Sequence, residues 1–188
     1  PTSRCGAPLG GRDELSGSAE TQLKPPEAAS LHAESRVGDA RLVNMIRSAT
    51  PADFPSIGRL YAQLQPADPL VEQSTHAAVF EEILHRPGME LLVLEVDGEV
   101  VGTTYLNVIP NLTRGGRPYG VIENVVVEER LRGAGLGRKL MDGTLARAWI
   151  EGCYKVMLMT GSKNPDTHAF YRASGFSPDA KQAYLARP

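Results

Sequence analysis

The sequence lacks the features that mark several large classes of protein. Two cysteines, Cys5 and Cys153, in 188 residues do not indicate a disulfide framework. No apolar run approaches the roughly 20 residues that a membrane-spanning helix needs. The formal net charge of −2 gives no sign of a nucleic-acid-binding protein. The opening PTSRCGAPLGG has no apolar core of the kind found in secretory signals, so we expect a cytoplasmic location.

Residues 1–40 contain no Phe, Tyr, Trp, Ile or Met, and they are rich in Ala, Gly, Ser, Pro and Glu. Such a composition buries too little apolar surface to offset the entropy lost on ordering the chain. We therefore expect a flexible or atypical leader over residues 1–44 and one folded domain over residues 45–188.

The periodicity of the first half of this domain predicts an α/β fold. VNMIRSAT (43–50) is typical of a strand, and Thr50 with Pro51 predicts the start of a helix in which Ile57, Leu60, Tyr61 and Leu64 face one side. A second helix is expected over STHAAVFEEILHR (74–86). The following run, 89–109, contains Asp97-Gly98 between two strand-like segments and predicts a hairpin.

The second half predicts one strand–helix–strand crossover. VIENVVVEE (121–129) is expected as a strand, residues 138–152 as a helix with a cap at Gly152, and YKVMLMT (154–160) as a parallel strand. A short helix over 166–174 and a final strand over 181–187 complete the prediction. The buried stripe of the long helix is expected to comprise Leu140, Met141, Thr144, Leu145, Ala148 and Trp149.

The segment RLRGAGLGRKLM (130–141) has glycines at Gly133, Gly135 and Gly137 between a predicted strand and a predicted helix. It does not match G-x-x-x-x-G-K-[ST], and its G-x-G-x-G spacing is not the G-x-G-x-x-G of dinucleotide-binding folds. Several backbone N–H groups at a helix N-terminus, with no side chains in the way, favour a pyrophosphate. A glycine-rich turn that binds no ligand is the alternative.

VVVEERLRGAGLGRKLM resembles the acetyl-CoA motif [RQ]-x-x-G-x-[GA] of the GNAT superfamily of acyl-CoA N-acyltransferases. Further along, Asn164 and the Tyr-x-x-x-Gly-Phe of residues 171–176 match the next landmarks of that family. The resemblance covers about residues 46–188. It implies a mixed β-sheet whose central parallel strands splay apart, flanked by about four helices, and an acetyl-CoA-dependent N-acetyltransferase without a metal. Family members often dimerise, so a homodimer is expected by analogy.

The resemblance also implies how the cosubstrate, acetyl-CoA, is bound. Backbone amides of the glycine segment would bind the CoA pyrophosphate, the preceding strand would pair with pantetheine, and Asn164 would hydrogen-bond the pantetheine arm. The expected cofactor-binding residues are Val125, Val126, Val127, Arg132, Gly133, Ala134, Gly135, Leu136, Gly137, Arg138 and Asn164.

Two residues are candidates for the chemistry of acetyl transfer. Glu123 interrupts an otherwise apolar strand and could act as general base, directly or through water. The alternative is an outward-facing carboxylate, because alternation sends Glu123 and Asn124 to opposite faces. Tyr171 could protonate the CoA thiolate, or it could be a core tyrosine. We interpret His168 as a surface histidine and Cys153 as a small buried residue.

The acceptor is the open question in the sequence. Residues 121–160 resemble the glucosamine-6-phosphate N-acetyltransferases of the family, but Asn124 and Met159-Thr160 stand where those enzymes carry Asp. An amino-sugar acceptor therefore remains one alternative, and a non-catalytic acetyl-CoA-binding module is another. Segments 65–75 and 111–120 are expected to rim the acceptor pocket. Arg114 and Arg117 could bind an acidic acceptor or could be solvated loop residues.

Overall fold

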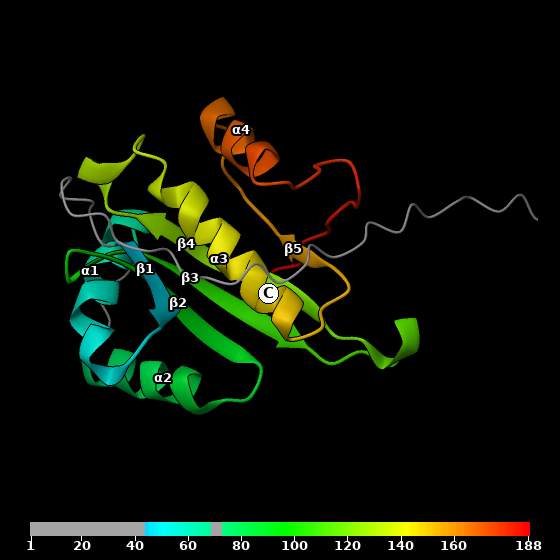
Figure 1. The fold of residues 1–188 in the computed structure, drawn as a ribbon, viewed down its shortest axis with the longest axis horizontal. Coiled ribbons are helices and arrows are strands. Elements are labelled where there is room, and N and C mark those ends of the chain that lie inside the picture. Colours follow the sequence, from blue (N-terminus) through cyan, green and yellow to red (C-terminus); the bar gives the residue numbers. More distant parts are fainter. Residues whose placement is uncertain (1–43, 69–72) are drawn as a thin grey trace, which may run out of the picture. The chain divides into compact units, whose positions relative to one another are not determined.

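The computed structural model describes residues 44–68 and 73–188. Residues 1–43 of the expected leader lie outside the described residues. Within the described residues the chain forms five strands and four α-helices (Figure 1). In chain order these are β1 (Asn44–Ser48), α1 (Phe54–Leu64), α2 (Gln73–His85), β2 (Met89–Val96), β3 (Glu99–Ile109), β4 (Tyr119–Val127), α3 (Leu136–Ile150), β5 (Val156–Leu158) and α4 (Pro165–Ala173).

The strands form one mixed sheet in the order β1-β2-β3-β4-β5. The first four are antiparallel neighbours, while β5 lies parallel to β4 after the crossover through α3. The tight β2–β3 connection is the predicted hairpin. Asp97 and Gly98 both have positive φ, 51° and 82°, as a two-residue turn between right-twisted strands requires.

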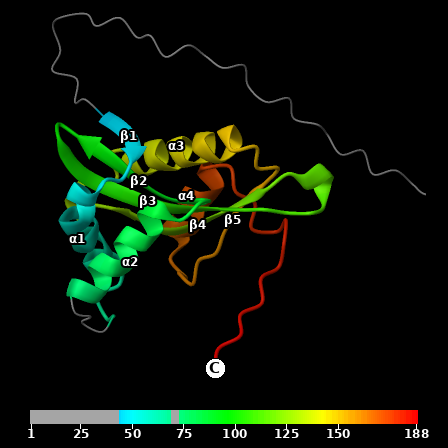
Figure 2. The ribbon, with the colours of Figure 1, turned by 90° about the horizontal axis from the view of Figure 1, so that it is seen from below.

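Helices cover both faces of the sheet (Figure 2). Helices α1 and α2 pack on one face through a cluster that includes Ile57, Leu60 and Phe80, with the strand residue Val126. Helix α3 packs on the other face, where Met141 and Ala148 meet Leu106 and Ile122. These two apolar layers hold β4 between them, and β4 carries Glu123 and the predicted pantetheine-binding residues Val125, Val126 and Val127.

Two predictions about local structure are wrong. Residues 181–187 form no strand, and Tyr184 and Leu185 are 87% and 78% exposed because they find no apolar face to cover. Trp149 was expected in the buried stripe of α3, but it is 48% exposed. The stripe is already complete with Leu140, Met141, Thr144 and Ala148, so the next residue turns toward solvent.

The β1–α1 junction is held by a buried carboxylate. Asp53 accepts hydrogen bonds from the Arg47 guanidinium at 2.7 and 2.9 Å and from the Thr50 backbone N–H at 2.7 Å. The hydrogen bond from Arg47, ahead of those from Thr50 and against the effect of burial, lowers the pKa of Asp53 to about 2. Thr50 thus precedes the helical segment as predicted, with Pro51 in its first turn.

This carboxylate makes a testable contribution to stability. A lowered pKa means that the stabilisation is complete above the ordinary value of 3.8 and is lost as pH falls through about 2. We expect Asp53→Asn to lower the free energy of unfolding at pH 7 by about 2 kcal/mol. Urea unfolding at pH 7 and pH 2 checks this, since the difference between the two proteins should shrink at the lower pH. An equal difference at both values would contradict it.

Candidate functional site

The parallel pair β4–β5 separates before β4 ends. Pairing runs from Gly120 with Val156 to Ile122 with Leu158, where β5 stops. Strand β4 continues through Glu123 to Val127 without β5 beside it. The splayed parallel strands implied by the family resemblance are therefore present, and they leave a length of β4 edge free of pairing to β5.

A β-bulge lies in this part of β4. The register with β3 shifts between Thr103 and Tyr105, and Asn124 adopts φ 51°. As a result, Ile122 packs against the α3 side while Val126 packs against the α1 side, although regular alternation would put both on one face. Because of the bulge, the side chains that follow it in β4 lie on the face opposite to the one that regular alternation predicts.

Glu123 and Asn124 do not face opposite sides, so the alternation argument was wrong at this position. Glu123 pairs with Tyr105 and lines a cavity with it, and Tyr105 packs against the α1–α2 cluster. Asn124 lies beside the Tyr61 phenol of α1. The physical reason is the bulge, which inserts one residue and breaks the period of two.

The glycine segment presents a run of unpaired backbone donors. Gly133 and Gly135 have φ of 82° and 79°, and a side chain at either position would meet open space. The first backbone hydrogen bond of α3 joins the Lys139 N–H to the Gly135 carbonyl. Within the described residues, the amides of residues 133–138 donate to no backbone acceptor, and no side chain caps α3. The Arg132 amide, by contrast, donates to Glu129.

The cations that flank this run are mostly held by other groups. Arg130 pairs with Glu99, and the Arg132 guanidinium donates to the Val127 carbonyl at 3.1 Å. Arg138 pairs with Asp142 and reaches the carbonyl of Ala173. The free backbone amides, together with the positive end of the α3 dipole, thus make the more direct anion site here.

Gly137 is a packing residue. A Cβ at this position would approach the Phe170 ring to 3.2 Å, so the missing side chain lets α4 approach α3. Phe170 and Tyr171 of α4 also pack in the same apolar cluster as Val125 of β4. The three glycines therefore serve different purposes: two allow a left-handed backbone, and the third allows close helix packing.

Helix α4 carries two of the predicted residues. Asn164 is its N-cap, and its side-chain oxygen accepts from the Asp166 N–H at 2.9 Å. Tyr171 is half-buried between Phe170 and Phe176. The centroid of its ring lies 5.1 Å from that of Phe170 and 6.3 Å from that of Phe176. His168 is also half-buried, and its Nε2 lies 2.8 Å from the Ser162 carbonyl.

The charge of Glu123 on β4 acts on Tyr171 of α4. Burial, and next the negative charge of Glu123, raise the pKa of Tyr171. The phenol therefore keeps its proton to a higher pH than usual and is available as a donor at neutral pH. The base and acid candidates, 48 residues apart in the chain, are brought close enough to interact.

Tyr61 is a residue that the sequence did not single out for function. Its hydroxyl is buried beside the Asn124 side chain, and burial raises its pKa to about 12. The helical periodicity placed Tyr61 only in an apolar stripe. Its position beside Asn124 depends on the bulge, which no local pattern in residues 119–127 predicts.

The remaining candidates lie outside this arrangement. Cys153 is buried, as predicted, and burial raises the pKa of its thiol. The Arg117 guanidinium donates to the carbonyls of Gly152 and Cys153, and Arg114 lies over the Tyr154 ring. Of the rim segment 65–75, residues 69–72 lie outside the described residues.

Neither a metal cluster nor a membrane span is found in the described parts of the chain. No three His, Cys, Asp or Glu side chains there come together in a way that could hold a metal ion. None of the helices in residues 44–68 and 73–188 has the length and apolar character needed to cross a membrane.

Comparisons with known proteins agree with this geometry. The model of the acetyltransferase (GNAT) family matches residues 57–176. Glucosamine 6-phosphate N-acetyltransferase of Trypanosoma brucei brucei is 34% identical over 142 residues, 74% of this chain and 93% of that protein. Aminoglycoside N(6')-acetyltransferase type 1 of Stenotrophomonas maltophilia is 30% identical, over 76% of this chain and 92% of that protein. A solved structure of a putative acetyltransferase from Agrobacterium tumefaciens is 41% identical, with a TM-score of 0.73, and the match covers 77% of this chain and 99% of that one.

Proposed function

Because the chain belongs to the acetyltransferase (GNAT) family and is an acetyl-CoA-dependent N-acetyltransferase, we propose that it transfers acetyl directly to a primary amine, with Glu123 as general base and Tyr171 as general acid. The observation that carries this proposal is the edge of β4 beyond Ile122. It lies free of β5 and is flanked by both residues.

Acetyl-CoA would bind along that edge. The amides of residues 133–138 would hold the pyrophosphate, with Arg132 contributing through its side chain rather than its amide. The Glu128 N–H donates to the Val101 carbonyl of β3, while the Val127 carbonyl accepts from Arg132 and not from β3. Because backbone groups along a strand point alternately to its two edges, those of Val125 and Val127 point toward the free edge. These groups would pair with pantetheine, and Val126 would line the strand without pairing. Asn164 would hold the arm near α4.

The chemistry then follows from the positions of three groups. Glu123 takes a proton from the ammonium group, and the free amine attacks the thioester carbon. The oxygen that becomes negative would accept a hydrogen bond from the Val125 N–H in the bulged strand. The carbon–sulfur bond breaks, and the thiolate takes a proton from Tyr171, which regains one from the amide nitrogen through solvent.

The acid role predicts the effect of Tyr171→Phe. We expect turnover to fall by roughly 10²-fold while acetyl-CoA affinity changes little, because the ring still packs between Phe170 and Phe176. Steady-state kinetics with calorimetric titration of acetyl-CoA measures both quantities. Tyr184→Phe, in the exposed C-terminal segment, is the matched control. An unchanged turnover number would leave Tyr171 with a packing role alone.

Two other functions remain as candidates. The relative from Trypanosoma brucei brucei favours a glucosamine 6-phosphate acceptor. A non-catalytic acetyl-CoA-binding module would bind the cosubstrate with no acceptor. Thiol release from acetyl-CoA across a panel of primary amines separates these functions. Tight binding of acetyl-CoA without amine-dependent CoA release would contradict the transferase proposal.

A further inference from the structure

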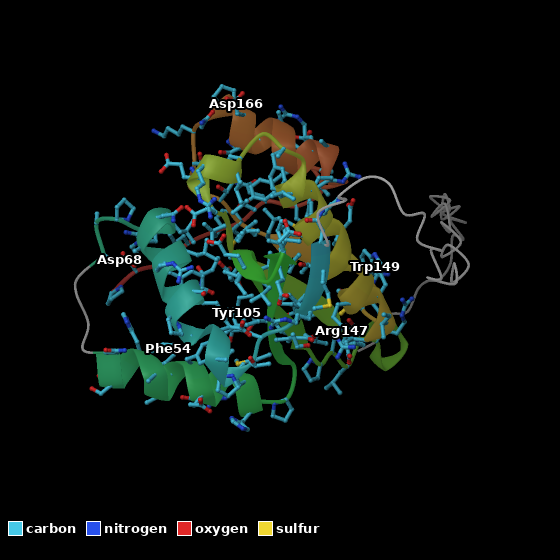
Figure 3. The ribbon with its side chains drawn as sticks, turned by 60° about the vertical axis from the view of Figure 1, so that its left-hand side comes forward. Phe54, Asp68, Tyr105, Arg147, Trp149 and Asp166 are labelled. Carbon is cyan, nitrogen blue, oxygen red and sulfur yellow. The ribbon has the colours of Figure 1, made fainter. Side chains whose placement is uncertain are left out.

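The cavity beside Glu123 is the place where an acceptor would meet the base. It lies at the ends of β2, β3 and β4 and has a volume of about 430 Å³, in the range of sites that hold small molecules. Figure 3 shows Tyr105, one of its lining residues, in the interior between α2 and the strands. What this cavity binds depends on the chemistry of its wall.

The wall is predominantly apolar. Six of its residues are hydrocarbon or thioether side chains: Pro87, Met89, Val108, Ile109, Pro110 and Val121. Tyr105 adds its ring rather than a free hydroxyl, because that hydroxyl donates to the Met89 sulfur at 2.9 Å. Among the described residues of the wall, Asn107 is the remaining neutral polar side chain. A hydrocarbon body would therefore be buried here at little polar cost.

The electrostatics of the wall favour a cation. Glu123 is its one charged side chain among the described residues. Helix α2 ends at His85, two residues before Pro87 of the wall, and a helix C-terminus carries partial negative charge. Arg86, the neighbouring cation in the chain, is not among the wall residues, and its ion pair with Glu82 offsets its charge, since both groups act on the Tyr105 phenol in opposite directions. Among the described residues of the wall, a phosphate would meet Glu123 and the end of α2 and no Arg or Lys side chain.

We propose that the acceptor is a primary amine on an apolar body, with its ammonium group on Glu123 and its hydrocarbon portion in the cavity, and not a phosphorylated amino sugar. This inference rests on the proposed transferase activity and names the substrate class for the same site. It also distinguishes the chain from the relative that acts on glucosamine 6-phosphate.

A series of straight-chain amines tests the proposal in the full-length protein. CoA release is measured with propylamine, butylamine, pentylamine and hexylamine, and KM should fall by about fourfold for each added methylene. Hexylamine should also have a kcat/KM at least about tenfold above that of 5-aminopentan-1-ol, which has the same length but ends in a hydroxyl. Glucosamine 6-phosphate is the third comparison, and kcat/KM for hexylamine should exceed kcat/KM for glucosamine 6-phosphate.

A pair of variants tests the location. Ile109→Arg puts a cation into the wall and should raise KM for hexylamine by about tenfold or more, and lower that for glucosamine 6-phosphate. Ile150→Arg, at a 75% exposed position of α3, should change neither. Circular dichroism confirms that both variants fold.

The outcomes separate the two proposals. A flat amine series, or a higher kcat/KM for glucosamine 6-phosphate, would overturn the apolar acceptor and leave the transferase intact. If acetyl-CoA binds in calorimetry and no amine raises CoA release, the transferase proposal fails, and the acceptor class fails with it.

Discussion

Replacing Gly135 by Glu should weaken CoA binding by about 10²- to 10⁴-fold, because two or more charge-assisted hydrogen bonds to the pyrophosphate would be lost. Gly135 is the N-cap of α3, and a side chain there would project into open space beside the unpaired amides. That is the space the pyrophosphate would occupy. A carboxylate would fill it and repel the ligand as well.

A second glycine with positive φ provides the control. Gly98 in the β2–β3 hairpin has φ 82° and equally open surroundings, so Gly98→Glu also puts a side chain on a positive-φ residue and adds the same charge. It should leave CoA affinity unchanged in isothermal titration. Equal affinity in the two variants would rule out the glycine segment as the pyrophosphate site.

Replacing Glu123 by Gln should lower kcat/KM by about 10²- to 10⁴-fold, because the amide is nearly the same size but cannot take the ammonium proton. The acid side of the pH–rate profile distinguishes a base from a structural group. The acid limb of the wild-type profile should be absent in the variant.

The exposed Glu81 of α2 is the control for this substitution. Glu81→Gln should keep both the rate and the acid limb. If Glu123→Gln still loses activity along the same acid limb, a different residue or solvent acts as the base.

Most elements of the fold could be predicted from the sequence because their signals are local. Asp97-Gly98, the stripe of α1 and the glycines before α3 each determine a turn or a helix from neighbouring residues alone. The final strand failed for the opposite reason. A strand over 181–187 needs an edge and an apolar face to pack on, and alternation in the segment cannot supply them.

The site was predictable in part for similar reasons. The glycine segment and the positions of Glu123 and Tyr171 follow from motifs, but the bulge at Asn124 does not, since its positive φ arises from pairing with β3. The bulge turns Asn124 toward Tyr61 of α1, on the same side of the sheet as Glu123. The apolar cavity likewise needs three strand ends and the end of α2, which no short segment contains.

A crystal structure of the protein with CoA bound tests the mechanism most directly. We predict pyrophosphate oxygens within about 3 Å of backbone nitrogens in residues 133–138, and the CoA sulfur at the free edge of β4 between Glu123 and Tyr171. A pyrophosphate held away from α3, or a sulfur far from both side chains, would contradict the proposed mechanism.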